Sequence, residues 1–147
     1  MTALDVISLQ SAKDYLRVDY SEDDAIITRL IKASVSRIEQ YTNYKLYQRD
    51  VVYNMYGCEL EIYDFPITLD TTLKTRQNVL SVTVFGRGGD VINASVGYSL
   101  VAGVPEDLLT ACYMLITAMY ENRDVYSLDL PLTIQGLINQ YRRSPSI

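Results

Sequence analysis

The sequence has no histidine, and this absence limits the chemistry that the chain can perform. Without an imidazole side chain there is no ordinary general base near neutral pH, no serine-type catalytic triad and no typical catalytic zinc site. Neither cysteine can be activated as a thiolate by a neighbouring imidazole. Catalysis by carboxylates is therefore the form of enzyme chemistry that this composition leaves open.

Cysteine and positive charge are also scarce. Cys58 and Cys112 do not make a disulfide framework, and Cys112 lies in an apolar helical run, so we expect two reduced, buried thiols. Thirteen Lys and Arg stand against 18 Asp and Glu, which gives a net charge of −5. General affinity for nucleic acid needs cations to neutralise phosphates, so it is not expected. A surface that DNA merely slides past is compatible with this charge.

Long hydrophobic runs are missing as well. The longest apolar stretch, 108–120, is shorter than the roughly 20 residues that a membrane span needs. The opening MTALDVISLQ has no basic segment before an apolar core, so we expect no signal peptide and a cytoplasmic product. The length of 147 residues and a globular composition predict one domain, residues 1–147.

Tyrosine, by contrast, is abundant, with 13 copies against two phenylalanines. Tyr is favoured where one end of a side chain is dry and the other is wet, as at subunit interfaces. Half-buried positions in a Tyr-rich strand region explain the number equally well. The composition alone leaves both interpretations open.

Capping residues and apolar spacing predict four helices, at residues 9–17, 22–43, 105–123 and 131–142. Ser8 and Ser21 are placed to cap the first two, and Asn43 is placed to end the second in the left-handed conformation. The third helix is apolar almost all round until the polar cluster that follows Tyr120. Such a helix lies at the centre of a bundle, and a neighbouring subunit can help to cover it.

Between the second and third helices, residues 48–102 have the composition of short strands. The segments VVYNMY, ELEIY, VLSVTVF and YSLVA are β-branched or aromatic, while FPITLD interrupts them with a proline. GRGGD, 86–90, is typical of a hairpin loop. The expected fold class is therefore mainly α, a small bundle of about four helices with an inserted antiparallel sheet of three to five strands.

Candidate sites for chemistry have structural explanations. The acidic cluster DYSEDD, 19–24, does not match an EF-hand loop, and a loop followed by a helix N-terminus accounts for it. GRGGD lacks the Lys-Ser/Thr and the following helix of a phosphate loop. We therefore predict no catalytic, cofactor-binding or metal-binding residues, and we do not expect an enzyme.

Three segments taken in order resemble one family. SLQSAKDYLRVDYSEDDAIITRLIKASVSRIEQYTNYKL resembles the opening of the head–tail connector (adaptor) proteins of long-tailed bacteriophages. VPEDLLTACYMLITAMYENRD is similar to that family's second hallmark, and LPLTIQGLINQYR is similar to its closing helix. Asn43 stands where the family often has Gly, and residues 48–102 match only loosely.

The resemblance implies a structural protein of the virion neck, assembled in the host cytoplasm. Such proteins form homo-oligomeric rings, often twelve-fold, on the portal protein. They extend the DNA channel, through which DNA passes without sequence-specific binding, and they hold the stopper or tail-completion protein. No membrane partner is implied. The alternative is a small DNA-binding regulator whose N-terminal half imitates a helix-turn-helix, but a recognition helix does not begin with acidic residues.

The basic, amphipathic chain end suggests where the portal is bound, since similar connectors dock through such an element. We expect this contact at Leu137, Ile138, Tyr141, Arg142 and Arg143. The polar end of the third helix suggests a subunit contact at Tyr120, Glu121, Asn122 and Arg123. Arg123 is expected to pair with an acid at the start of the second helix or on the adjacent subunit.

Overall fold

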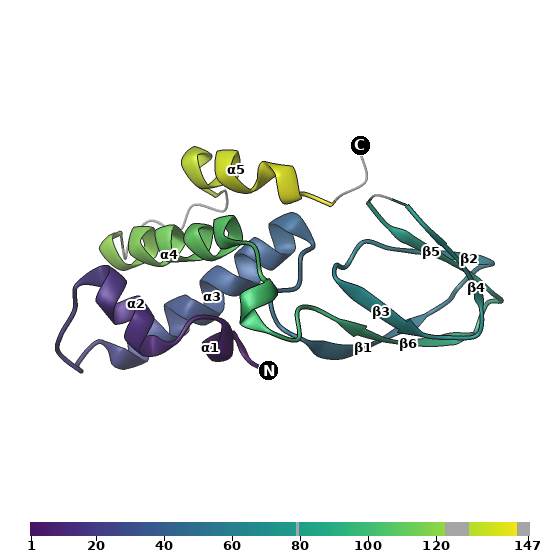
Figure 1. The fold of residues 1–147 in the computed structure, drawn as a ribbon, viewed down its shortest axis with the longest axis horizontal. Coiled ribbons are helices and arrows are strands. Elements are labelled where there is room, and N and C mark those ends of the chain that lie inside the picture. Colours follow the sequence, from purple (N-terminus) through teal and green to yellow (C-terminus); the bar gives the residue numbers. More distant parts are fainter. Residues whose placement is uncertain (79, 123–129, 144–147) are drawn as a thin grey trace.

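Helices and strands occupy opposite ends of an elongated molecule (Figure 1). The computed structural model describes residues 1–78, 80–122 and 130–143. The helical half consists of residues 1–47, 98–122 and 130–143, and the strand half of residues 48–78 and 80–97. The helical elements are α1 (Ala3–Val6), α2 (Leu9–Leu16), α3 (Asp24–Thr42), η1 (Val101–Gly103), α4 (Glu106–Glu121), α5 (Leu132–Ile138) and η2 (Asn139–Tyr141). The strands are β1 (Arg49–Asn54), β2 (Glu59–Ile62), β3 (Ile67–Asp70), β4 (Lys74–Gln77), β5 (Val82–Phe85) and β6 (Val91–Val96).

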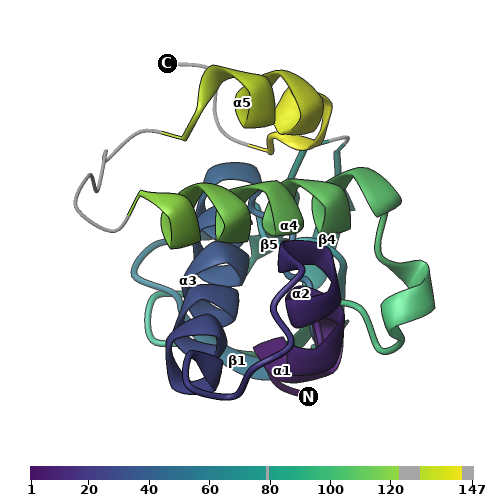
Figure 2. The ribbon, with the colours of Figure 1, turned by 90° about the vertical axis from the view of Figure 1, so that its left-hand side faces the viewer.

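In the helical half, α4 is the central element. Figure 2 shows α4 across α2 and α3, with α5 on its other side. Its buried side chains are Leu108, Ala111, Cys112, Leu115 and Ile116. They pack against α3, whose apolar residues recur every three or four positions, and against Ile134 and Ile138 of α5. The periodic spacing of α3 therefore forms one wall of the main core.

Local residue preferences explain how the helices begin and end. The Ser8 hydroxyl accepts a hydrogen bond from the Ser11 N–H and caps α2, as the sequence predicts. Asn43 ends α3 in the left-handed conformation, with φ at 60°. The expected cap at Ser21 is wrong. The helix starts at Asp24 with Asp23 as its first flanking residue, because Ser21 belongs to a turn in which its carbonyl accepts the Asp24 N–H at 3.2 Å.

The strand half contains two antiparallel sheets of three strands, in the orders β1-β6-β3 and β2-β5-β4. A small second core lies between them, formed by Met55, Ile62, Val84 and Ile92. The expected hairpin at 86–90 is wrong because β5 and β6 belong to different sheets, so this loop carries the chain from one sheet to the other. Asp90 fixes the turn, since its Oδ2 accepts the Arg87 N–H at 2.7 Å.

The expectation of a mainly helical fold is wrong. Helix accounts for 44% and strand for 22% of the described residues, so the protein is of mixed α/β class. Three of the strands lie outside the segments predicted to be strands. VINASV, between GRGGD and YSLVA, forms β6. FPITLD contains β3, because its proline at position 66 precedes the strand and removes no hydrogen bond from the ladder. KTRQ forms β4 although all four of its residues are exposed. YSLVA, by contrast, forms a bend and the start of η1.

The two cysteines lie in different environments, and neither is in a disulfide. Cys112 is buried in α4, and burial raises the pKa of its thiol. The expectation that Cys58 is buried is wrong, because it lies in the exposed turn between β1 and β2.

Candidate functional site

The C-terminal end of α4 is tied to the start of α3 by a cluster of polar side chains. Tyr120 Oη donates a hydrogen bond to Asp23 Oδ2 at 2.6 Å, and Tyr20 Oη lies 3.1 Å from Tyr120 Oη. The hydrogen bond to the Asp23 carboxylate raises the pKa of Tyr120, because ionisation would replace a donated hydrogen by a second negative charge. Tyr120, predicted as a subunit contact, thus has an intramolecular role in this structure.

The other residues predicted for this contact lie just beyond the cluster. Glu121 and Asn122 are exposed. Asn122 closes the helix, since both its backbone N–H and its side-chain amide donate to the Ala118 carbonyl at 3.1 Å. Arg123 lies outside the described residues. Among the described members of the predicted set, Glu121 and Asn122 are exposed and Tyr120 is half-buried.

The predicted portal-binding residues of the last helix differ in exposure. Ile138 is fully buried in the main core, and Leu137 is packed against that core. Tyr141 Oη donates to Asp107 Oδ2 at 2.9 Å, and Gln140 Nε2 donates to the same oxygen at 3.0 Å. The bond to Asp107 raises the pKa of Tyr141. Asp107 thus fastens η2 to the first turn of α4.

Arg143 joins the helical half to the strand half. Its backbone N–H donates to the Thr42 carbonyl at 2.9 Å, and its carbonyl accepts the side-chain amide of Asn43. Its Nε donates to the Leu80 carbonyl at 3.1 Å, and its guanidinium lies 4.2 Å from the centre of the Phe65 ring. Arg142 is exposed, with its guanidinium 5.3 Å from the Tyr41 ring centre. Arg142 is therefore the more accessible of the two basic residues.

A buried carboxylate makes a second connection between the halves. Glu39 accepts the Leu46 N–H at 2.7 Å and forms a salt bridge with Arg49 at 2.8 Å between Oε2 and Nη2. Lys45 pairs with Asp64 at 3.0 Å, and Asp64 also accepts the Tyr53 hydroxyl. Sequence reasoning missed these pairs. Glu39 on the buried stripe of α3 was the available signal, since a buried charge needs a partner.

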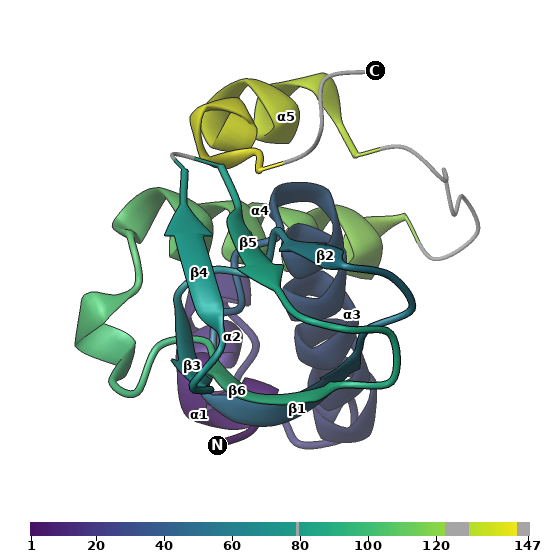
Figure 3. The same cartoon turned by 90° about the vertical axis from the view of Figure 1, so that its right-hand side faces the viewer.

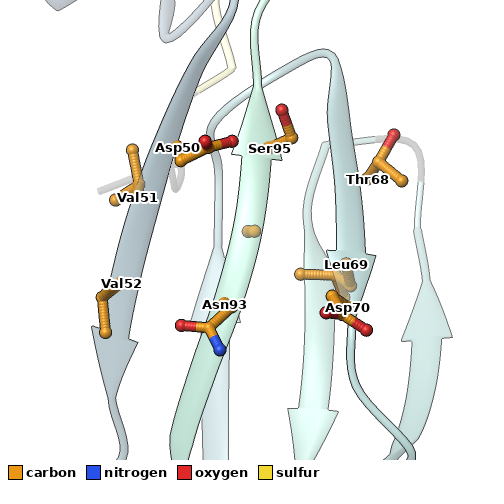
Figure 4. A pocket seen from close by; sticks show the side chains of 9 residues that line it. Asp50, Val51, Val52, Thr68, Leu69, Asp70, Asn93 and Ser95 are labelled. Carbon is orange, nitrogen blue, oxygen red and sulfur yellow. The ribbon is translucent and has the colours of Figure 1, made fainter.

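The outer face of the β1-β6-β3 sheet carries a groove with two carboxylates (Figure 4). Asp50 of β1 lies opposite Ser95, and Asp70 of β3 lies opposite Asn93. The lining residues are Asp50, Val51, Val52, Thr68, Leu69, Asp70, Asn93, Ala94 and Ser95. The charged residues among them are two aspartates, and they include no Lys or Arg.

Within residues 1–78, 80–122 and 130–143, no three acidic or cysteine side chains are placed to hold a metal ion. No helix in the same ranges has both the length and the apolar character of a membrane span. The polar clusters described above are hydrogen-bonded connections between structural elements.

Comparison with known proteins shows which family and which solved structures this chain resembles. The model of the phage gp6-like head–tail connector protein family matches residues 6–142. Chains in three solved gene transfer agent (GTA) particle structures share the fold. In the native virion the similar chain is 16% identical with a TM-score of 0.78, over 100% of this chain and 94% of that chain. In the neck of the empty particle, computed with C6 symmetry, the similar chain is 17% identical with a TM-score of 0.74, over 97% of this chain and 92% of that chain.

Two further structures extend this likeness. A chain in the neck of the native particle, computed with C12 symmetry, is 18% identical with a TM-score of 0.70, over 100% of this chain and 95% of that chain. In the crystal structure of bacteriophage HK97 gp6, the chain is 14% identical with a TM-score of 0.51, over 95% of this chain and 96% of that chain. No curated protein sequence matches this chain.

The fold and the family model together define a structural protein of the virion. Head–tail connectors are structural proteins and do not form a class of enzymes. The chain belongs to the phage gp6-like head–tail connector family, as the ordered segments of the sequence indicate. The DNA-binding regulator is correspondingly disfavoured, because α3 begins with Asp23 and Asp24 and buries its apolar stripe against α4.

Proposed function

We propose that this head–tail connector forms a closed ring, twelve-fold in the assembled particle, in the neck of a virion. The supporting observation is the likeness of almost the whole chain to subunits of neck structures computed with C6 and C12 symmetry, combined with membership of the connector family. A ring requires a heterologous interface, in which two different surfaces of one subunit meet on successive copies.

The ring sits on the portal protein through the outward side of α5 and the chain end. Leu132 at the start of α5 is 83% exposed, and Arg142 is exposed beyond its end. Ile138, Tyr141 and Arg143 support this surface from within, because their contacts lie inside the subunit. An exposed apolar side chain and a cation on one terminal element suit a partner with a polar and apolar surface.

The ring also extends the DNA channel and presents a platform to the stopper or tail-completion protein. The net charge of −5 supports passage of DNA without retention, since like charges oppose binding. The acidic groove containing Asp50 and Asp70 contributes to this negative charge.

Purified portal protein of the same virus tests the proposal. We expect negative-stain images and native mass spectra of the mixture to show one ring of this chain on each portal. A double variant, Leu132→Asp with Arg142→Glu, is expected to lose attachment while retaining the wild-type circular dichroism spectrum. Truncation after Gln135 is not a suitable test, because it would also remove the buried Ile138. A protein that never joins the portal at high concentration contradicts the proposal.

A further inference from the structure

The two edges of the β2-β5-β4 sheet carry opposite charges. Figure 3 shows β5 between the two edge strands. In β2, the exposed side chains Glu59 and Glu61 lie opposite Phe85 and Thr83 of β5. In β4, the basic residues at positions 74 and 76 lie opposite the same two residues. Directly opposite residues share a face, so one outer face runs from acidic to basic.

These charges form no ion pair among the residues that the structure describes. Lys74 and Arg76 lie two strand spacings from the glutamates, each about 4.8 Å. Among the described residues, no carboxylate lies within 4.0 Å of either cation. Arg76 instead lies 5.5 Å from the centre of the Phe85 ring. The basic edge is therefore available to an acidic partner.

The strand β4 is also less covered than any other strand described. All four of its residues are exposed, including Thr75 and Gln77, whose alternation directs them to the inner side of the sheet. It pairs with β5 alone, so its outer edge presents unpaired backbone N–H and C=O groups. A strand with so little burial in its own subunit gains most from a second strand beside it.

We infer that this sheet continues from one subunit to the next, with β4 of one copy against β2 of its neighbour. The inference rests on the proposed ring and assigns the surfaces that close it. Charge complementarity selects a second copy as the occupant, since the acidic edge that fits β4 is on the same chain. The contact is heterologous, as a ring requires. Because β2 and β4 are both antiparallel to β5, rotation about an axis along the strands gives a parallel pair.

Lysine on an edge strand has another use, since it discourages pairing with unrelated edges. The two roles differ in what charge reversal does. A purely protective edge tolerates replacement of its cations by glutamate, because either charge repels apolar strands. An edge that recognises Glu59 and Glu61 is repelled by them after the same change, and like charges across an interface weaken assembly.

Charge exchange on the full-length chain decides between these roles. The acidic variant carries Lys74→Glu and Arg76→Glu, so both of its edges are negative. The basic variant carries Glu59→Lys and Glu61→Lys, so both of its edges are positive. We expect each variant alone to lose ring formation on the portal by about tenfold or more, because identical charges meet at every contact. An equimolar mixture restores rings in which the two variants alternate.

Three controls complete the test. Circular dichroism and thermal unfolding establish that each variant is folded, which matters for Glu61 because it accepts hydrogen bonds from Tyr63 and Ser81. The single changes Glu59→Lys and Lys74→Glu repeat the exchange without altering Glu61. Arg29→Glu with Lys32→Glu, two exposed residues of α3, makes the same change in net charge elsewhere.

Native mass spectra and negative-stain images of the portal mixtures give the result. Restoration in the equimolar mixture, with the α3 control unaffected, supports the β4–β2 contact. Wild-type ring formation by the acidic variant alone, or equal loss in the α3 control, overturns it and leaves the proposed function standing. Failure of the wild type to form a ring overturns the proposed function itself.

Discussion

The guanidinium of Arg143 lies 4.2 Å from the centre of the Phe65 ring, which brings the segment after η2 against the residues that lead into β3. The same side chain donates to the Leu80 carbonyl. Arg143 is 63 positions from Leu80 and 78 positions from Phe65 in the sequence, and the three residues form one cluster between the two halves of the molecule.

Replacement of Arg143 by alanine is expected to lower the free energy of unfolding by about 1–2 kcal/mol, because it removes a cation–π contact and a hydrogen bond. Urea denaturation followed by circular dichroism measures the loss. Arg143→Lys is the matched control and should be intermediate, since lysine keeps the charge without the planar group. Unchanged denaturation midpoints in both variants would contradict the role assigned to this contact.

Tyr120→Phe removes the hydroxyl that donates to Asp23, and we expect a lower urea midpoint at pH 7. The phenylalanine keeps the ring in the core, so only the polar contact is tested. Tyr15→Phe provides the control, because Tyr15 stacks on Tyr113 and that stacking survives the change. Equal midpoints in wild type and Tyr120→Phe would show that the cluster adds nothing to stability.

The same hydrogen bond predicts a response to alkaline pH. The pKa of Tyr120 is raised in the folded state from a usual value of 10.0. Its contribution is therefore fully present below pH 10 and is lost as the pH rises through the folded-state pKa. The difference in urea midpoint between wild type and Tyr120→Phe should shrink above pH 10. A midpoint difference that stays constant to pH 11 would contradict the prediction that ionisation of Tyr120 removes this contribution.

Gly97→Ala is expected to destabilise the protein by about 3 kcal/mol or more. A Cβ at position 97 would lie 2.0 Å from the Tyr47 carbonyl oxygen, and the backbone there has a φ of +96°. Gly57→Ala is the control, since nothing lies within 4 Å of its added Cβ, and it should stay within about 0.5 kcal/mol of wild type. Thermal unfolding of the two variants gives the comparison.

Asn43 offers a test of the helix end. Its φ of 60° suits glycine and disfavours alanine, so Asn43→Gly should be more stable than Asn43→Ala by about 1 kcal/mol. Both variants lose the amide that donates to the Arg143 carbonyl, which cancels in the comparison. Equal stability of the two variants in urea would remove the backbone conformation as the reason for this residue.

Local signals predicted the helices better than the strands. The stripe of α3, the Ser8 cap and the left-handed Asn43 depend on neighbouring residues, and those features are legible in one segment. The strand β4 has no apolar alternation, and its existence depends on pairing with β5. The assignment of GRGGD to a hairpin failed for the same reason, because only the pairing shows that its flanking strands belong to different sheets.

The contacts of the candidate site could not be predicted from patterns within single segments of the sequence. Tyr120 and Asp23 are 97 positions apart, and Tyr141 and Asp107 are 34 apart. Each of these residues has the pattern of an ordinary helix terminus, and no local pattern indicates its partner. The family pattern identified the class of protein because it depends on the order of segments, whereas these pairs depend on three-dimensional packing.

The contacts of Arg143 have a mechanical consequence. Arg143 is hydrogen-bonded to Thr42 at the end of α3 and to Leu80 before β5, so displacing this residue breaks contacts with both. Arg143 thus fixes the position of the segment after α5 relative to both a helix and a sheet.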